Sequence, residues 1–133
     1  MNVLLDTHAL VWWLLEPRHL SGPARKAIEQ ADEVFVSAAS IYEIDYRREK
    51  SRASGDPSDS VHFRIPRNMP GSLPQLDLMR VDITAEVAWR VARLPLIHKD
   101  PWDRLLVAQA NILDARLISR DETLRLYDVD ILW

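Results

Sequence analysis

The chain of 133 residues is 47% hydrophobic and 28% charged, a composition typical of one soluble globular domain. It contains no cysteine, which excludes disulfides, thiolate zinc sites, iron–sulfur clusters and cysteine nucleophiles. The formal net charge of −3 disfavours a protein that coats nucleic acid electrostatically. No apolar run approaches the roughly 20 residues that span a bilayer. The first residues carry no basic region of a signal peptide, so we expect a cytoplasmic protein.

The first residues predict a strand followed by two helices. The apolar run 3–5 ends at Asp6 and predicts a buried strand. Thr7 can cap the helix that follows, and Pro17 marks its end. Ser21 is a suitable cap for a second helix, which has a proline in its first turn.

The middle of the chain is its least regular part. A second predicted strand at residues 34–36 leads into a helix from residue 38 to about residue 52. The polar stretch 51–60 is rich in turn-forming residues and predicts a loop or a mobile segment, and three prolines follow it. This region is too short to separate two domains, so we expect one domain over residues 1–133.

The second half of the chain continues the alternation of strands and helices. A third strand is predicted at residues 77–83, with Thr84 capping the helix after it. Asp100 opens another helix, and strands at residues 117–119 and 130–133 complete the chain. Short apolar strands alternating with helices predict an α/β fold: a mostly parallel sheet of about five strands, flanked by helices.

Four acidic residues are expected to meet at one edge of this sheet. Asp6 ends the first strand, Asp121 follows the fourth, and Glu43 and Asp103 lie near the starts of helices that leave the same edge. Two carboxylates about 4 Å apart repel by roughly 4 kcal/mol at an effective dielectric constant of about 20. Protons or cations must therefore neutralise such a cluster. Oxygen ligands favour Mg²⁺ or Mn²⁺ over zinc, in an arrangement suited to phosphodiester hydrolysis.

Each acid also has an ordinary structural interpretation. Asp6 could be a turn residue at a strand end, and Glu43 could be a solvated helix residue. Asp100 and Asp103 occupy the cap and third positions of a typical helix start, and Asp121 could cap a short helix. The four histidines show no metal-ligand spacing, which favours structural or exposed roles for them, although His98 is the nearest to the proposed site.

Four segments, in order, resemble motifs of the PIN-domain family, specifically of the VapC-type toxins of prokaryotic toxin–antitoxin systems. They are residues 4–13 (LLDTHALVWW), 37–44 (SAASIYEI), 98–110 (HKDPWDRLLVAQA) and 117–121 (LISRD). The resemblance implies a PIN-like three-layer sandwich, an acidic Mg²⁺ or Mn²⁺ site, and endoribonuclease activity on RNA. It also implies a homodimer, and a cognate antitoxin that blocks the acidic groove, often with an inserted arginine.

The resemblance also assigns roles to individual positions. The catalytic and metal-binding set that it implies is Asp6, Glu43, Asp103 and Asp121. The supporting positions beside this set are Thr7, Asp100 and Ser119. Our candidates for positioning the RNA backbone are Arg47, Arg48 and Arg104. The chain departs from the family pattern at residues 45–47 and again over residues 50–74.

Two other functions are compatible with the same acidic site. One is a non-catalytic PIN-like binding module, whose acids only receive an arginine from a partner. The other is a DNA nuclease, since the groove geometry that reads the 2′-hydroxyl group is not visible in a sequence. A phosphatase with an aspartyl nucleophile is less compatible, because His8 stands where that chemistry wants a second acid.

Overall fold

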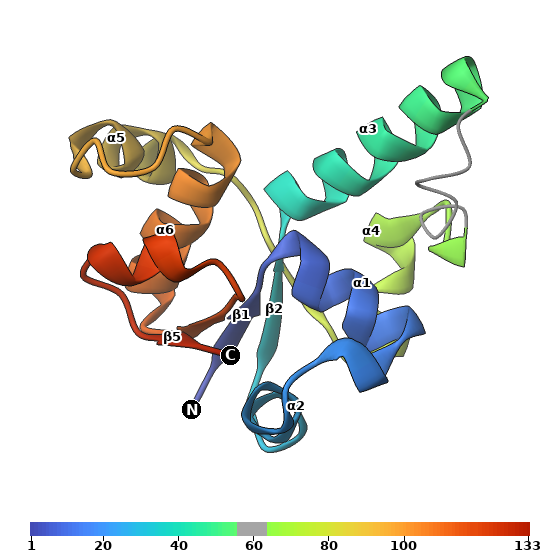
Figure 1. Cartoon of the computed structure of the whole chain (residues 1–133), viewed down its shortest axis with the longest axis horizontal. Coiled ribbons are helices and arrows are strands. Elements are labelled where there is room, and N and C mark those ends of the chain that lie inside the picture. The colour runs from blue at the N-terminus through green and yellow to red at the C-terminus, as the bar shows by residue number, and fades with distance from the viewer. Residues whose placement is uncertain (56–63) are drawn as a thin grey trace.

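The computed structural model describes residues 1–55 and 64–133, which form a parallel sheet with helices on both faces (Figure 1). The strands are β1 (Val3–Leu5), β2 (Val34–Ser37), β3 (Met79–Val81), β4 (Arg116–Ile118) and β5 (Ile131–Leu132). The helices are α1 (Thr7–Leu15), α2 (Gly22–Glu29), α3 (Ala38–Ser54), α4 (Met69–Ser72), α5 (Ala85–Arg93) and α6 (Pro101–Leu113). Within the described residues, short 3₁₀ helices also occur at Pro17–His19, Pro74–Leu76 and Glu122–Leu126.

The sheet has the order β3-β2-β1-β4-β5, and every pair of neighbouring strands is parallel. β1 lies in the centre, where Leu5 is in register with Val36 of β2 and with Ile118 of β4. The carboxyl ends of these three strands are therefore level, and the residues that follow them reach the same edge. This confirms the predicted α/β class with a parallel five-stranded sheet.

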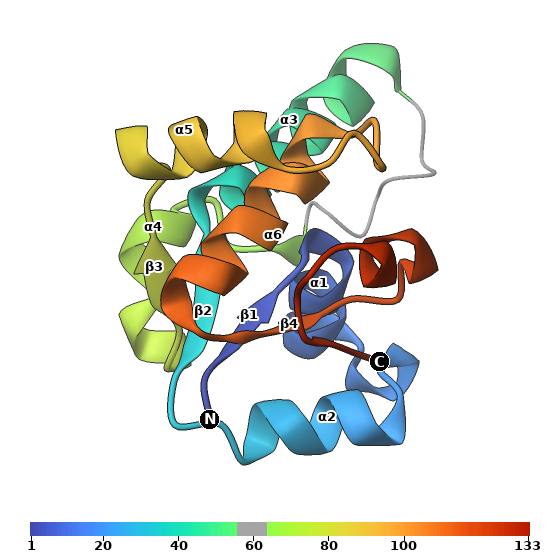
Figure 2. The same cartoon turned by 90° about the vertical axis from the view of Figure 1, so that its left-hand side faces the viewer.

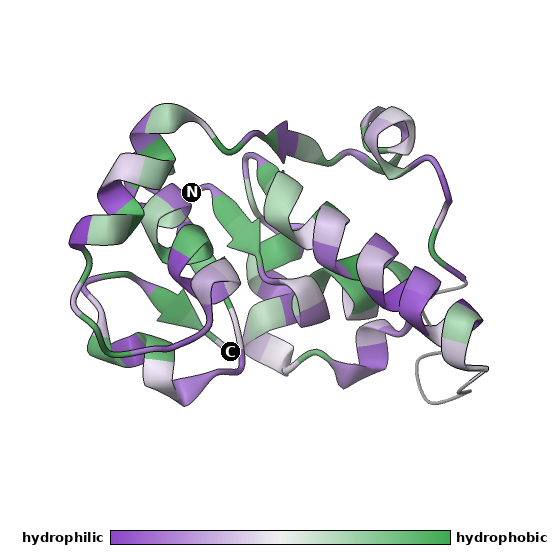
Figure 3. Cartoon of the chain, turned by 90° about the horizontal axis from the view of Figure 1, so that it is seen from above, coloured by the Kyte–Doolittle hydropathy of each residue, from purple (hydrophilic) through white to green (hydrophobic). Residues whose placement is uncertain are grey.

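Two hydrophobic cores hold the three layers together, because successive side chains of a strand point to opposite faces. Val3 and Leu5 pack on one side with α1, α2 and α3, and Leu4 packs on the other with α6 and β4. Figures 1 and 2 show α5 and α6 on one side of the strands and α1 and α3 on the other. In Figure 3 most of the sheet is hydrophobic, although one strand is partly hydrophilic, whereas the helices alternate between hydrophobic and hydrophilic residues.

Several predicted boundaries need correction. The cap of α1 is Asp6 rather than Thr7, since a carboxylate oxygen of Asp6 accepts from the main-chain nitrogen of Ala9 at 2.7 Å. Helix α3 continues to Ser54 and ends at Gly55, whose φ of 69° is left-handed. The first residues of the predicted loop are thus helical, and its residues 56–60 lie outside the described part of the chain.

Other boundaries agree more closely with the prediction. Ser21, Thr84 and Asp100 cap their helices as expected, and each accepts a hydrogen bond from the first turn. The third strand is shorter than predicted, at Met79–Val81. Among the described residues, no helix is both long and apolar enough to cross a membrane.

Candidate active site

The four acids predicted from the sequence line one pocket of about 250 Å³ at the carboxyl ends of β1 and β4. The lining residues are Asp6, Thr7, His8, Glu43, Arg47, Asp100, Asp103, Arg120 and Asp121. Strand ends supply the first and last acids, α3 supplies Glu43, and the first turn of α6 supplies Asp103. Two of the three supporting positions, Thr7 and Asp100, are also part of the wall.

Asp6 is a capping residue whose carboxylate is poorly solvated. Burial raises the pKa of Asp6, and the nearby charge of Glu43 adds to this effect. Hydrogen bonds from the side chain of Ser119 and the main chain of Ala9 lower the pKa and offset burial only in part. A cation beside Asp6 would remove the cost of its negative charge.

Asp103 is an acid of the pocket whose pKa is strongly raised. Burial, together with the negative charges of Asp100, Asp6 and Asp121, raises the pKa of Asp103 to about 7. His98 acts in the opposite direction. The side chain is still 28% exposed, so it can reach a ligand in the pocket.

Asp121 keeps its charge because donors surround it. One of its oxygens accepts from the main-chain nitrogen of Thr123 at 3.0 Å and from its hydroxyl at 2.6 Å. The other lies 2.8 Å from Nε2 of His98. Burial would raise the pKa of Asp121, but the hydrogen bonds from Thr123 and His98 outweigh burial and hold the pKa below its usual value.

Glu43 is held by two side chains. Oε2 accepts from the hydroxyl of Thr7 at 2.6 Å, and that hydroxyl lies 3.1 Å from the hydroxyl of Ser40. Oε1 forms an ion pair of 3.0 Å with Arg47, one turn further along α3. Glu43 therefore has a fixed orientation at the pocket wall, unlike a solvated helix residue.

Ser119 is buried directly behind the acids. Its hydroxyl accepts from the main-chain nitrogen of Asp121 at 3.1 Å, and its side chain also hydrogen-bonds Asp6. It links the ends of β1 and β4 without facing the pocket.

Two of the arginines considered for RNA contacts are structural. Arg48 is 2% exposed and donates to the main-chain carbonyl of Ile65 at 2.7 Å. Arg104 is 7% exposed, and donates to three main-chain carbonyls of the segment 91–95 and to the hydroxyl of Tyr127. Because both guanidinium groups are buried, the structure contradicts their assignment to the RNA backbone. Arg47 does line the pocket.

No role was predicted from the sequence for Arg120, which lines the pocket, or for His98, which was expected only to lie near the site. Arg120 lies between Ser119 and Asp121 and joins Arg47 at the pocket wall, with its guanidinium carbon 4.9 Å from the ring centre of Trp12. His98 contacts Asp121 and lies 3.4 Å from Asp103. No spacing rule finds such a histidine, because Asp121 is 23 residues away in the chain.

The donor set of the pocket fits a hard divalent cation. Within the described residues, ligand atoms of His98, Asp103 and Asp121 lie within 4.8 Å of one another. Asp6 and Glu43 add carboxylates to the same pocket, and the pKa values of Asp6 and Asp103 are both raised. Carboxylate-rich sites are those that Mg²⁺ and Mn²⁺ prefer in proteins.

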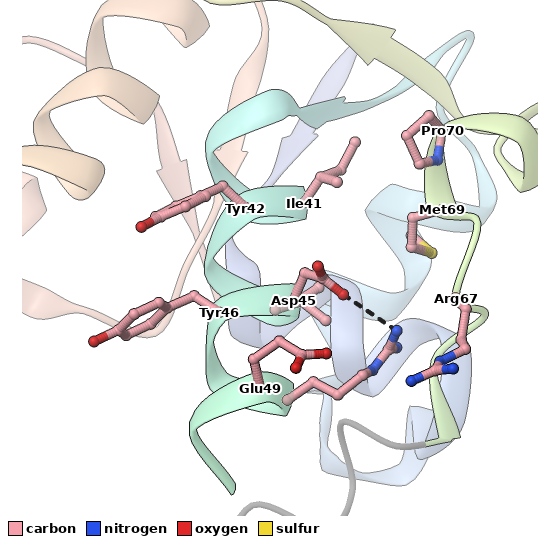
Figure 4. Close-up of a pocket in the computed structure, with 10 residues that line it drawn as sticks. Ile41, Tyr42, Asp45, Tyr46, Glu49, Arg67, Met69 and Pro70 are labelled. Carbon is pink, nitrogen blue, oxygen red and sulfur yellow. Dashed lines mark hydrogen bonds and ion pairs between the residues drawn. The ribbon is translucent and has the colours of Figure 1, made fainter. Parts of the chain in front are cut away.

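A second pocket, of about 420 Å³, lies on another side of α3 (Figure 4). Its wall contains Tyr42 and Tyr46, and its acid Asp45 forms an ion pair with Arg48, drawn as a dashed line in Figure 4. None of the four clustered acids lines this second pocket. The two pockets share no lining residue, so this second pocket is separate from the acidic one.

Comparisons with known proteins agree with this architecture. The family model described as "PIN domain" matches residues 3–130. The chain is 38% identical over 127 residues to "Ribonuclease VapC22" of Mycobacterium tuberculosis (strain ATCC 25618 / H37Rv), a match covering 93% of this chain and 90% of that protein.

Two solved structures share the fold. VapBC2 from Rickettsia felis, bound to a DNA fragment from its promoter, has a TM-score of 0.62 at 13% identity, over 99% of this chain and 98% of that one. FitAcB from Neisseria gonorrhoeae has a TM-score of 0.61 at 19% identity, over 98% of this chain and 96% of that one. Because the family model covers nearly all of the sequence, the chain belongs to the PIN domain family.

Proposed function

We propose that this protein is an endoribonuclease dependent on Mg²⁺ or Mn²⁺, acting as the toxin of a toxin–antitoxin pair. The observation that carries the proposal is the convergence of four carboxylates in one pocket, with the pKa values of Asp6 and Asp103 raised. Such a site is stable when a cation neutralises it, and a bound divalent cation can activate water for phosphodiester hydrolysis. The 38% identity to a ribonuclease supports RNA as the substrate.

The four acidic side chains would have two different roles. Asp6, Asp103 and Asp121 would hold the metal, which, when bound, lowers the pKa of water and stabilises charge on the phosphate. Glu43, fixed by Thr7 and Arg47, would orient the attacking water or hold a second metal. No protein nucleophile is needed.

The remaining polar residues would support this set. Asp100 caps α6 and so directs Asp103 into the pocket, and Ser119 restrains Asp6. Arg47 and Arg120 lie where a substrate phosphate would approach the acids, so we propose them as backbone contacts in place of Arg48 and Arg104.

We further propose a cytoplasmic homodimer and a cognate antitoxin. An antitoxin that inserts an arginine into the acidic pocket would supply the positive charge that the acids lack, and would exclude metal and substrate together. In vitro, adding such a partner should reduce both RNA cleavage and Mn²⁺ binding.

The decisive test is cleavage of a labelled structured RNA by the purified protein in Mn²⁺, in EDTA, and by Asp103→Asn in Mn²⁺. Asp114→Asn is the matched control, since it removes the same charge from the far end of α6, and asparagine tolerates the left-handed φ of 49° there. We expect cleavage by the wild-type protein and the control in Mn²⁺ only, and none by Asp103→Asn.

The same experiment separates the alternatives. Cleavage that persists in EDTA would contradict the metal-dependent mechanism. Equal cleavage of a DNA of the same sequence would favour a DNA nuclease. No cleavage in any condition, together with no effect of Mn²⁺ on the melting temperature, would favour the binding module.

A further inference from the structure

We propose that His98 is a positioning residue of the metal site: its Nε2–H group holds the carboxylates of Asp121 and Asp103 in place without coordinating the metal. This inference rests on the proposed metal-dependent function. Nε2 of His98 lies 2.8 Å from one oxygen of Asp121 and 3.4 Å from one oxygen of Asp103. These two acids belong to different segments, and the imidazole bridges them.

The position of the proton on the imidazole ring decides whether His98 can coordinate a metal or can only donate a hydrogen bond through Nε2. Nδ1 of His98 accepts a hydrogen bond of 3.0 Å from the main-chain nitrogen of Asp100. A ring nitrogen that accepts in this way carries no proton, so the proton of the neutral ring is on Nε2. An Nε2–H group donates to carboxylates and has no lone pair to offer a metal.

The main chain of His98 is also held in place by hydrogen bonds. The main-chain nitrogen of His98 donates to the hydroxyl of Tyr127 at 2.9 Å, and the same hydroxyl accepts from Arg104 at 3.1 Å. Arg104 in turn binds the carbonyls of the segment 91–95 that leads to His98. The two buried side chains thus fix the main chain, while Asp100 fixes the ring.

The consequence for Asp121 follows from counting its acceptor sites. A carboxylate offers about four lone pairs. Thr123 uses two of them on one oxygen, and His98 uses one on the other. The remaining lone pair is on the oxygen that His98 holds, 2.8 Å from Nε2, and an oxygen of Asp103 lies 3.4 Å from the same nitrogen. His98 therefore sets the direction in which Asp121 presents itself to a cation.

Direct coordination by His98 is the competing arrangement, since its ring lies within reach of the same cation as the two acids. It would place the ring proton on Nδ1, where it would face the main-chain N–H of Asp100. The two arrangements also differ in metal preference, because an imidazole ligand favours Ni²⁺ over Mn²⁺ relative to oxygen ligands.

The test is calorimetric binding of Mn²⁺ and of Ni²⁺ to the wild-type protein, His98→Ala and His98→Gln. The glutamine amide can place an N–H near the position of Nε2. Removing such a supporting donor typically weakens metal binding by about 10–100-fold. We expect His98→Ala to lose that factor equally for both metals, and His98→Gln to recover most of it. His19→Ala is the matched control, because His19 pairs with Glu16 away from the acidic pocket.

Each other result overturns the inference. Unchanged Mn²⁺ binding in His98→Ala would show that the acids need no support from the ring. A loss in His98→Ala and His98→Gln alike, larger for Ni²⁺ than for Mn²⁺, would assign His98 as a ligand. If the wild-type protein itself binds no Mn²⁺, the proposed function fails together with the inference, whereas the first two results leave the metal site intact.

Discussion

The metal-free protein should become more stable when Asp103 is replaced by asparagine. The pKa of Asp103 is raised from 3.8 to about 7. Each pKa unit corresponds to about 1.36 kcal/mol. Keeping this carboxylate ionised in the folded state therefore lowers the free energy of unfolding by up to about 4 kcal/mol. Asparagine keeps the shape of the side chain but has no charge to bury.

The sign of the pH dependence follows from the direction of the shift. Between pH 4 and pH 7 the folded protein binds the proton of Asp103 more tightly than the unfolded chain does, so stability falls as the pH rises. The advantage of Asp103→Asn is therefore largest above pH 7, and it vanishes below about pH 4, where both states of the wild-type protein are protonated.

Thermal unfolding in EDTA from pH 4 to pH 9 measures this difference. For a chain of this length, each kcal/mol moves Tm by roughly 4 °C, so the variant should melt up to about 15 °C higher at pH 8. Asp114→Asn controls for the loss of one negative charge from α6. A variant that melts at or below the wild-type temperature at pH 8, or gains most at low pH, would refute the reasoning.

Three further predictions concern the same elements. Mn²⁺ at 100 times its Kd should stabilise the wild-type protein by about 2.7 kcal/mol in thermal unfolding, and should not stabilise Asp103→Asn. An equal rise of Tm in both proteins would place the ion elsewhere. Arg104→Ala should lower the free energy of unfolding by about 2–4 kcal/mol in urea, because three main-chain carbonyls lose their donor, and a loss below 1 kcal/mol would contradict its structural role. Thr7→Val should keep Tm within a few degrees yet slow RNA cleavage by about tenfold, because it removes the hydroxyl that donates to Glu43. Unchanged cleavage would contradict a role of the oriented Glu43 carboxylate in catalysis.

The sheet and the edge where the acids meet could be predicted because buried parallel strands appear in the sequence as short, uninterrupted apolar runs. The runs 3–5 and 34–36 are apolar without alternation, as strands covered on both faces must be, and both are fully or largely buried. The rule that parallel strands end at one edge then brought Asp6 and Asp121 together without knowledge of any distance. The end of α3 was harder to predict, because residues 51–54 are mostly polar and begin a stretch rich in turn-forming residues, yet Ser51 is buried.

The roles of the arginines and of His98 could not be predicted, because they depend on which side of a helix or loop a long side chain takes. Arg47 and Arg48 are adjacent in sequence, yet one pairs with Glu43 in the pocket and the other is buried and donates to the main-chain carbonyl of Ile65. Both residues carry the same charge and lie on the same predicted helix, so the sequence alone does not show which of them faces the pocket. Partners from 17 and 23 residues away fix Arg48 and His98, and no local pattern records such partners.

The acids of the pocket also show why helix capping and metal binding are not alternative roles for a carboxylate. Asp6 caps α1 with one oxygen, and Asp121 caps the 3₁₀ helix Glu122–Leu126 with one oxygen. Each cap restricts the rotation of its carboxyl group, so the second oxygen keeps one direction toward the pocket. The hydrogen bonds that make these residues good caps thus also orient them to receive a cation, and it is burial, not capping, that raises the pKa of Asp6. A search that discards acids because they fit a helix start would discard this site.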